Sequence, residues 1–425
     1  MTGFRAEVTI ESIGRRGDGV AALEGGIVHV PATAPGDRVA VALTEAGPGR
    51  FRGRLLEVLE AGPDRRAPPC RHFGACGGCA LQHLAPEAYG AWKTDLLRGL
   101  LARNGLDGAT VEPLHSSPPG SRRRATFAIR RRRDDAIVGF NERHSHRVVD
   151  LSACPVVLPE IAALIEPLRA WAATALKAGD RADAHVAMTD SGIDLSIRTT
   201  ARLGGAGRAA LVDLMAREGL ARVARAHPKQ DGAEVLAEAR PVRAVHSGVA
   251  LALAPGAFAQ ATADGEAALT GFVLEAAEGA ARAFDLFCGS GAFTLPLAQR
   301  GCSVLAADID KTAVANLAAA ARQANLAKLQ TEPHNLMRKP IPSGQLAGAD
   351  LVVFDPPRAG AKAQAAEIAA AGVPVVVAVS CDPGTFMRDA RILVDGGYRL
   401  TRLRPVDQFL WSPHLELAAR FDFAG

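Results

Sequence analysis

The sequence contains no long hydrophobic run and few cysteines or aromatic residues. Its longest strongly apolar segment, "AGVPVVVAVS" at residues 371–380, is far too short to cross a bilayer and predicts a buried strand. The first twenty residues lack the apolar segment of a secretory signal peptide. We therefore expect a cytoplasmic protein with no membrane partner, in which disulfides are disfavoured and clustered cysteines serve metal binding or catalysis.

Only seven cysteines occur in 425 residues, yet three of them are close neighbours. The segment "PPCRHFGACGGCALQH" holds Cys70, Cys76 and Cys79. Three thiols at this spacing in a cytoplasmic chain indicate a metal site or a reactive centre more than a disulfide framework.

Positive charge is concentrated in one part of the chain. The net charge is only +4, but residues 61–150 carry fifteen Lys and Arg against nine Asp and Glu. The run "RRRATFAIRRRR" has two interpretations: a solvated pair of strands with exposed arginines, or a phosphate-binding surface of a nucleic-acid binder. The arginines in question are Arg122, Arg123, Arg124, Arg130, Arg131, Arg132 and Arg133.

Strand and turn signals divide the chain into three units. Residues 4–60 alternate short β-type runs with Gly and Asp turns, the pattern of a small barrel. From residue 256 strands alternate with helices, which is typical of a doubly wound, Rossmann-like α/β domain. An α+β region is expected between them, with helices over 86–103, 159–178 and 207–225. The predicted units are residues 1–62, 63–255 and 256–425.

A glycine turn in the last unit predicts a nucleoside cofactor. In "DLFCGSGAF", Gly289 and Gly291 stand where a strand must turn sharply into a helix, and missing side chains let a ligand approach the backbone. Asp308 ends the next strand, where an acid commonly binds ribose hydroxyls. The loop lacks the third glycine of a dinucleotide site and the lysine of a P-loop. This combination favours S-adenosylmethionine over a dinucleotide or ATP.

Three further strand ends converge on the same edge of the predicted sheet. "FDPPR" fixes the carboxylate of Asp355, "VSCDPGT" presents Cys381, and "SPHLELAARF" places Glu416 at the start of a strand. Methylation of C5 of uracil needs such a set, because this carbon is too poor a nucleophile to attack a methyl sulfonium unaided. A thiolate that adds at C6 creates an enolate that can attack, and a base must then remove the C5 proton.

Taken in order, these motifs resemble the bacterial RNA (uracil-C5)-methyltransferases, most closely the type that acts on 23S ribosomal RNA. "DGVAALEGGIVHVPATAPGDRV" resembles the family's TRAM domain, an OB-like RNA-binding barrel, and "CRHFGACGGCALQH" its iron–sulfur motif. "DLFCGSGAFTLPLA", "DPPRAG", "VSCDPGTFMRD" and "HLE" resemble its catalytic motifs in the family order. The likeness covers almost the whole chain and implies a class I methyltransferase domain at the C-terminus.

The resemblance implies a role for each matching residue. Cys381 is the implied nucleophile and Glu416 the base that takes the C5 proton. One departure is Ala292, where the family usually has Asn, and this change removes one side-chain contact to the cofactor. The implied contacts to S-adenosylmethionine are Gln260, Phe287, Gly289, Gly291, Asp308, Asn335 and Asp355.

The resemblance also supplies a fourth cysteine, Cys154 in "VVDLSACPV". Four thiolates suffice for a [4Fe–4S] cluster or a zinc ion, and spacing alone does not separate the two. The resemblance favours iron–sulfur, with zinc as the alternative. Because methyl transfer moves no net electrons, we expect the cluster to support an RNA-binding surface and not to take part in the reaction.

The expected partner is 23S ribosomal RNA, with no obligatory protein partner indicated. The target uridine must be extruded into the site, and the barrel and the arginine run would hold the flanking RNA. With only three Trp and two Tyr, base stacking would fall to Phe, His and Arg, and Phe127 and His144 are candidates.

Two alternatives remain open at this point. One is the same chemistry on transfer RNA or on a different 23S uridine, although the transfer-RNA branch typically lacks the barrel and the cysteine motif. The other is a non-catalytic iron–sulfur RNA-binding protein that retains an inactive methyltransferase domain. The intact Cys381 and Glu416 argue against the second alternative.

Overall fold

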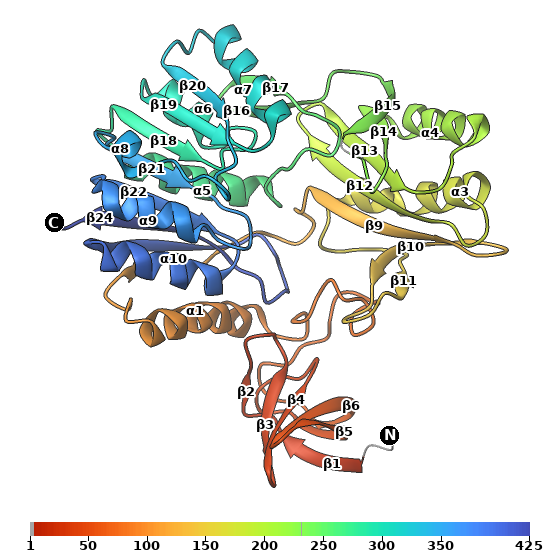
Figure 1. Cartoon of the computed structure of the whole chain (residues 1–425). Helices are drawn as coiled ribbons and strands as arrows, with labels where there is room; N and C mark the ends of the chain where they lie inside the picture. The colour runs from red at the N-terminus through yellow and green to blue at the C-terminus, as the bar shows by residue number, and fades with distance from the viewer. Residues whose placement is uncertain (1–3, 231) are drawn as a thin grey trace.

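A six-stranded sheet forms the N-terminal part of the computed structural model, which describes residues 4–230 and 232–425 (Figure 1). Its strand order is β1-β5-β6-β4-β3-β2, and its core is built from alternating small apolar residues such as Val28, Val30 and Val41. The predicted series of short strands over residues 4–60 is therefore confirmed. The strands are β1 Phe4–Thr9, β2 Ser12–Ile13, β3 Gly19–Leu23, β4 Gly26–Val30, β5 Arg38–Gly47 and β6 Arg50–Glu60.

A seven-stranded sheet with helices on one face forms the second part. The helices pack on the sheet through a single apolar core that includes Phe127, Trp171 and Leu195. The strand order is β11-β10-β9-β12-β13-β14-β15, in which only β13 and β14 are parallel. The elements are β9 Arg124–Arg131, β10 Ala136–Asn141, β11 Val148–Asp150, α2 Pro159–Ala163, α3 Ile165–Ala175, β12 Arg181–Thr189, β13 Gly192–Thr199, α4 Gly205–Glu218, β14 Arg222–Ala226 and β15 Ala233–Glu238.

Two sequence predictions for this part are wrong. The helix expected over residues 207–225 ends at Glu218, because Gly219 adopts the left-handed conformation (φ 65°) and the following residues form β14. Phe127, a candidate for base stacking, is fully buried and stacks on Phe140 within the protein. It therefore cannot contact RNA.

The C-terminal part is a doubly wound α/β domain, as predicted. Five parallel strands in the order β20-β19-β18-β21-β22 are followed by β24, which runs antiparallel between β22 and β23. Helices cover both faces of this sheet (Figure 1). The elements are α5 Ala263–Ala276, β18 Arg282–Leu286, α6 Thr294–Gln299, β19 Ser303–Asp308, α7 Lys311–Gln323, β20 Leu329–Pro333, α8 Ser343–Leu346, β21 Leu351–Phe354, α9 Lys362–Ala371, β22 Val375–Ser380, α10 Pro383–Asp395, β23 Tyr398–Asp407 and β24 Glu416–Phe423.

Segments from the expected middle unit also belong to this sheet. Helix α1 (Pro86–Arg103) packs Leu97 and Leu101 into the core of the C-terminal domain, and β7 (Thr110–Val111) and β8 (His115–Ser116) pair with β23. The hairpin of β16 (Arg243–His246) and β17 (Val249–Ala252) packs against α7. The predicted range 63–255 is thus divided between two cores, because the edge strand β23 gains partners from far upstream.

None of the helices in the described part of the chain is both long and apolar enough to cross a membrane.

Candidate active site

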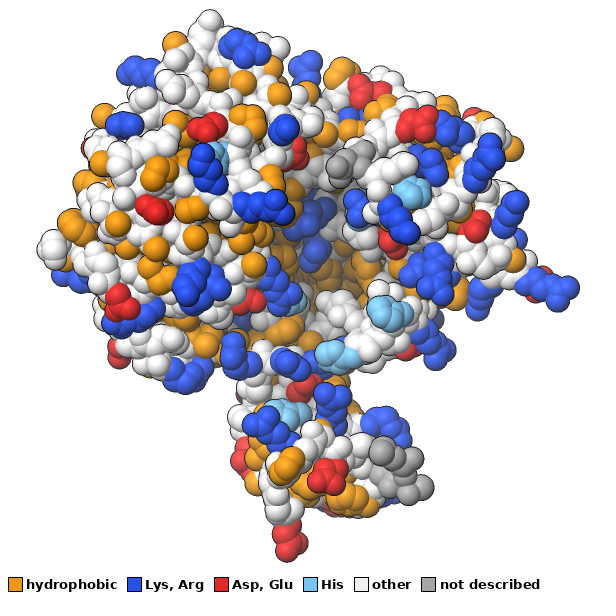
Figure 2. All heavy atoms as spheres, in the orientation of Figure 1, with side chains coloured by type: hydrophobic (Ala, Val, Ile, Leu, Met, Phe, Trp, Pro, Cys, Tyr) orange, Lys and Arg blue, Asp and Glu red, His pale blue; other side chains and the backbone are white. Residues whose placement is uncertain are grey.

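One cavity of about 450 Å³ opens at the carboxyl ends of β18, β19, β21 and β22. The space-filling view shows a hollow lined with Lys and Arg between the C-terminal domain and the second sheet (Figure 2). Most of the predicted catalytic and cofactor-binding residues line the cavity although they are far apart in the sequence. They are Gln260, Phe287, Gly289, Asp308, Asn335, Asp355, Cys381 and Glu416.

The glycine turn after β18 forms one wall of the cavity. Phe287 is forced into the left-handed region (φ 64°), and both Phe287 and Cys288 donate their backbone N–H groups to the carbonyl of Ala307. The two predicted glycines act differently. A Cβ on Gly289 would meet no atom within 4 Å, whereas one on Gly291 would lie 2.6 Å from Leu317 of α7. Gly289 therefore leaves room for a ligand, and Gly291 allows close packing of the helix.

Asp308 at the end of β19 is oriented by the backbone around it. Its carboxylate accepts hydrogen bonds from the N–H groups of Gly289 (3.0 Å) and Asp310 (2.8 Å). Asp310 in turn caps α7 by accepting from Thr312 and Ala313. A carboxylate has about four lone-pair sites, so Asp308 keeps acceptors for two ligand hydroxyls.

Sequence reasoning missed Asp285, which lies beneath this turn. It is fully buried, and the Thr294 hydroxyl donates to one carboxyl oxygen. Burial raises the pKa of Asp285 to about 7, and the charges of Asp355 and Asp308 add to the shift. The sequence signal was available, because Asp285 is an acid inside the otherwise apolar strand that leads into the glycine motif.

Strand register brings the predicted nucleophile and base together. Ser380 of β22 pairs with Leu417 of β24 in the antiparallel ladder, so the next position places Cys381 opposite Glu416. Side chains of opposed residues on antiparallel strands lie on the same face, with Cβ atoms about 5 Å apart. Burial raises the pKa of the Cys381 thiol to about 11, and the negative charges of Glu416 and Asp355 contribute to this.

Glu416 belongs to a buried network of amides and carboxyls. Gln408 Nε2 donates to Glu416 Oε2 (2.9 Å) and to Gln260 Oε1 (2.8 Å), and Gln260 Nε2 donates to Asp355 Oδ2 at 3.3 Å. Burial raises the pKa of Glu416 to about 8 and that of Asp355 to about 7. Both groups can therefore exchange protons near neutral pH.

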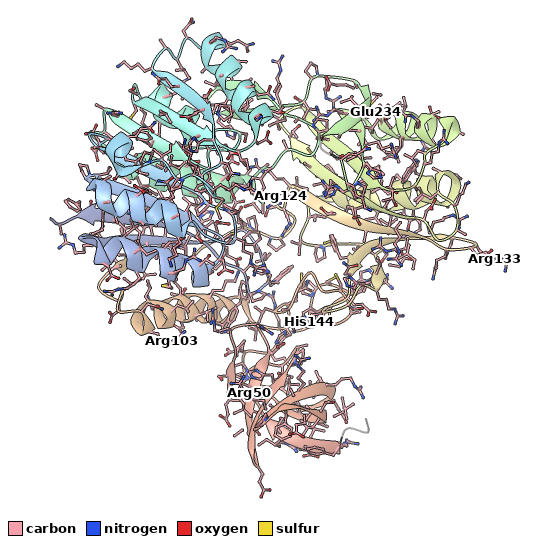
Figure 3. All side chains as sticks on the ribbon, viewed as in Figure 1. Arg50, Arg103, Arg124, Arg133, His144 and Glu234 are labelled. Carbon is pink, nitrogen blue, oxygen red and sulfur yellow. The ribbon has the colours of Figure 1, made fainter. Side chains whose placement is uncertain are left out.

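The predicted arginine run is not one surface. Arg124 lines the active cavity, whereas Arg133 lies at the far end of the β9–β10 hairpin, about 30 Å along an extended strand (Figure 3). Arg123 is engaged inside the protein, where it pairs with Glu266 and donates to the Gln260 carbonyl. Arg132 pairs with Asp135.

The other arginines of the run also differ in their surroundings. Arg122 donates to the Arg124 carbonyl and places its guanidinium over the Phe409 ring, next to the cavity. Arg130 and Arg131 lie toward the hairpin end of β9, where both donate to backbone carbonyls. The sequence could not separate these groups, since all seven arginines look alike in a linear run.

The four cysteines of the predicted cluster are free thiols and partly buried. Burial raises the pKa of Cys76, Cys79 and Cys154, and the other thiols add to each shift, so the four lie within electrostatic range of one another. In the part of the chain that the structure describes, no three His, Cys, Asp or Glu side chains are grouped as ligands of a metal ion. The metal site stays a prediction.

The cysteine segment contacts the loop between β23 and β24 directly. The N–H groups of Ala80 and Leu81, next to Cys79, both donate to the carbonyl of Trp411 at 2.8 and 3.1 Å. Trp411 stands between Gln408 and Glu416 and has a positive φ of 58°. No local sequence signal indicates this contact, because the two segments are more than 300 residues apart.

Comparison with known proteins agrees with this architecture. A family model for the tRNA (Uracil-5-)-methyltransferases matches residues 248–420, and a TRAM domain model matches residues 1–56. An uncharacterized RNA methyltransferase of Brucella suis is 40% identical, covering 97% of this chain and 97% of its own length. The 23S rRNA (uracil(1939)-C(5))-methyltransferase RlmD of Halomonas elongata is 33% identical, with 97% of this chain and 88% of that protein covered.

A solved structure shares the whole fold. It is a tRNA (uracil-54, C5)-methyltransferase of Pyrococcus abyssi in complex with S-adenosyl-L-homocysteine, with a TM-score of 0.76 and 23% identity over 98% of this chain and 100% of that chain. That likeness shows the fold. The two relatives, at least 33% identical over nearly the full length, identify the chain as a member of the RNA (uracil-C5)-methyltransferase family.

Proposed function

We propose that the protein transfers a methyl group from S-adenosylmethionine to C5 of a uridine in 23S ribosomal RNA, through a covalent bond between Cys381 and C6 of the base. The observation that carries this proposal is the position of Cys381 opposite Glu416 at one cavity, set by the register of β22 and β24. A nucleophile and a base on the same edge are what C5 methylation requires.

The reaction follows from the two side chains. The Cys381 thiol first gives up its proton to solvent. The resulting thiolate forms a bond to C6, and the C5=C6 electron pair moves toward the C4 carbonyl to give an enolate. C5 of the enolate then takes the methyl group, and the sulfonium of the methyl donor becomes a neutral thioether. Glu416 removes the C5 proton, the C5=C6 double bond re-forms, and the Cys381 sulfur leaves with the electrons of its bond to C6.

The cavity fits S-adenosylmethionine as methyl donor. The open space above Gly289 accommodates a ligand close to the backbone, and Asp308 keeps free acceptors for ribose hydroxyls. Phe287, Asn335, Gln260 and Asp355 line the same cavity. Ala292 is not among the lining residues, so the absence of the family's Asn leaves the shape of the cavity intact.

The RNA would enter between the second sheet and the C-terminal domain. Arg124 has no ion-pair partner among the described residues, its buried Nε has no hydrogen-bond partner there, and burial lowers its pKa to about 10. Its guanidinium stands over the ring of Phe258, which is 61% exposed. A half-buried cation without a carboxylate partner, next to an exposed aromatic ring, suits a phosphate and an unstacked base.

Transfer RNA is the second candidate substrate. The Pyrococcus abyssi protein shares the fold over 98% of this chain, so the presence of an N-terminal barrel does not by itself select ribosomal RNA. The expectation that the transfer-RNA branch lacks this architecture is weakened accordingly. We favour 23S rRNA because the RlmD relative covers 97% of this chain at 33% identity.

We also propose that Cys70, Cys76, Cys79 and Cys154 hold a [4Fe–4S] cluster. The support is that the four thiols are free, partly buried and within electrostatic range of one another. When bound, the cluster would fix the Cys79 segment, whose neighbours hold the Trp411 carbonyl. Purified protein should be brown with about four irons per chain. Stoichiometric zinc without iron would refute the cluster.

The experiment for the main proposal is methyl transfer from labelled S-adenosylmethionine to unmodified 23S rRNA and to unmodified tRNA, with Cys381→Ala as the matched variant. We expect 5-methyluridine in 23S rRNA and none with the variant. Label in tRNA alone would keep the chemistry and change the substrate. No label in either RNA, from protein with its metal content intact, would favour a non-catalytic RNA-binding protein.

A further inference from the structure

We propose that Gln408 is a positioning residue that favours the ionised form of the Glu416 carboxylate and aims it at the C5 proton. This inference rests on the proposed function and adds a residue to it. Gln408 is 2% exposed, lies on the loop after β23, and does not line the cavity. It therefore acts on the reaction only through its neighbours.

The orientation of the Gln408 amide is fixed by the backbone. Its Oε1 accepts the N–H of Ala261 at 2.8 Å, so the NH₂ group must point the opposite way. Its two hydrogens then go to Gln260 Oε1 (2.8 Å) and Glu416 Oε2 (2.9 Å). Both hydrogens of the NH₂ group are therefore used. If the amide were flipped, Gln408 Oε1 would face the Glu416 carboxylate and repel it.

Packing also prevents Gln408 from moving away. A Cβ added to Gly265 in the first turn of α5 would lie 3.0 Å from the Gln408 Cβ and 2.6 Å from the Thr262 hydroxyl. The start of α5 therefore lies directly on the Gln408 side chain. Glycine at position 265 provides the space that this contact needs.

A donor at this position counteracts the effect of burial on Glu416. Burial raises the pKa of Glu416, the charge of Asp355 raises it further, and the hydrogen bond from Gln408 lowers it, as does the charge of Arg124. The Cys381 thiol, directly after β22, faces the same carboxyl. Of these contributions, only the amide hydrogen bond also orients the carboxylate. It holds Glu416 Oε2 and leaves Oε1 to accept the C5 proton.

The test replaces Gln408 by Met, which keeps the length and volume but removes both donors. Two steps are followed separately: formation of the covalent RNA–protein adduct with labelled methyl donor, and release of tritium from [5-³H]uridine in the RNA. We expect adduct formation and S-adenosylmethionine affinity to change less than threefold. Tritium release at pH 7 should fall about ten- to hundredfold, the range for removing a hydrogen bond to a charged group.

The pH profile separates this role from a merely structural one. For Gln408→Met the rise of tritium release with pH should move to higher pH, and the deficit should shrink as the pH rises from 7 to 9, because a growing fraction of Glu416 then ionises without the hydrogen bond. A deficit of equal size at every pH, or an unchanged rate, would overturn the inference. Gln330→Met, on the exposed surface of β20, is the matched control and should behave as wild type.

A second variant keeps the inference testable if Gln408→Met folds poorly. Gln408→Glu retains the acceptor for Ala261 N–H but places a second carboxyl against Glu416, so the profile should move to higher pH still. An unmoved profile in this variant would contradict the positioning role. Wild-type protein that forms no adduct and releases no tritium would instead refute the proposed function, and the inference with it.

Discussion

Lys93 of α1 and Asp407 at the end of β23 form an ion pair in which the side chains are only 1% and 0% exposed. Asp407 also accepts from the Tyr89 hydroxyl at 2.6 Å, and Lys93 also donates to the carbonyl of His414 at 2.7 Å. Two residues one turn apart on α1 thus hold both ends of the loop that contains Gln408 and leads into Glu416. Burial lowers the pKa of Lys93, and the charge of Asp407 opposes the shift.

Lys93→Met should therefore destabilise the protein strongly. The change leaves the Asp407 carboxylate buried without its cation, which typically costs about 3–5 kcal/mol. Urea unfolding at pH 7 measures the decrease in free energy. The control is Arg391→Met, which breaks an exposed pair with Asp395 on α10 and should cost less than about 1 kcal/mol. Equal costs for the two variants would contradict a structural role of the buried pair.

The two glycines of the cofactor turn should respond differently to alanine. Gly291→Ala places a methyl group 2.6 Å from Leu317 and should lower the free energy of unfolding by about 2–3 kcal/mol. Gly289→Ala meets open space at φ 52°, so it should cost about 1 kcal/mol of stability but weaken ligand binding at least tenfold. Thermal melts and calorimetric titration with S-adenosylhomocysteine check both. Tight ligand binding by Gly289→Ala would show that the ligand does not pass over this residue.

Glu416→Gln should stabilise the protein increasingly as the pH rises from 5 to 8. In the folded protein the pKa of Glu416 is about 8, whereas its ordinary value is 4.5. Between these values the folded state holds a proton that the unfolded state has released, so the wild type loses stability with rising pH, by at most about 1.4 kcal/mol per unit. The neutral amide has no such dependence. Melting temperatures of the two proteins that differ by the same amount at pH 5.5 and 8 would contradict the raised pKa.

The strand ends that carry the site were accessible from the sequence because each follows a local rule. A short apolar run followed by "CGSG", "DIDK", "DPPR" or "SCDPG" predicts a buried parallel strand and a polar turn, and parallel strands bring such turns to one edge. The positions of Asp308, Asp355 and Cys381 follow from this rule alone. This rule does not predict that Glu416 faces Cys381, because that position depends on the antiparallel pairing of β24 with β22.

What the sequence did not reveal depends on long-range contacts with no local signature. Lys93 lies in a helix of ordinary composition, and only the fold shows that it reaches Asp407. Gln408 is likewise unremarkable until the Ala261 N–H fixes its amide. The arginine run has a conspicuous local pattern that suggested a single RNA-binding surface. Its residues are spread along a strand and its hairpin, so Arg123 and Arg133 have unrelated surroundings.

Arg124 and Arg133 should therefore contribute differently to RNA binding. Arg124→Gln removes a guanidinium that lines the cavity and has no ion-pair partner among the described residues, so methylation at low RNA concentration should fall about a hundredfold. Arg133→Gln removes an exposed charge at the hairpin tip and should leave the maximal rate unchanged.

A variant that no longer binds one of the RNA phosphates should show a salt dependence of RNA affinity that is shallower by about one unit of slope. Filter binding between about 50 and 200 mM salt gives the slope for each variant, because phosphate contacts change the RNA affinity measurably over this range. The affinity for S-adenosylhomocysteine is the control for an intact cofactor site. A larger loss of maximal rate in Arg133→Gln than in Arg124→Gln would mean that the hairpin, and not the cavity, holds the RNA. The proposed RNA path between the second sheet and the C-terminal domain would then be wrong.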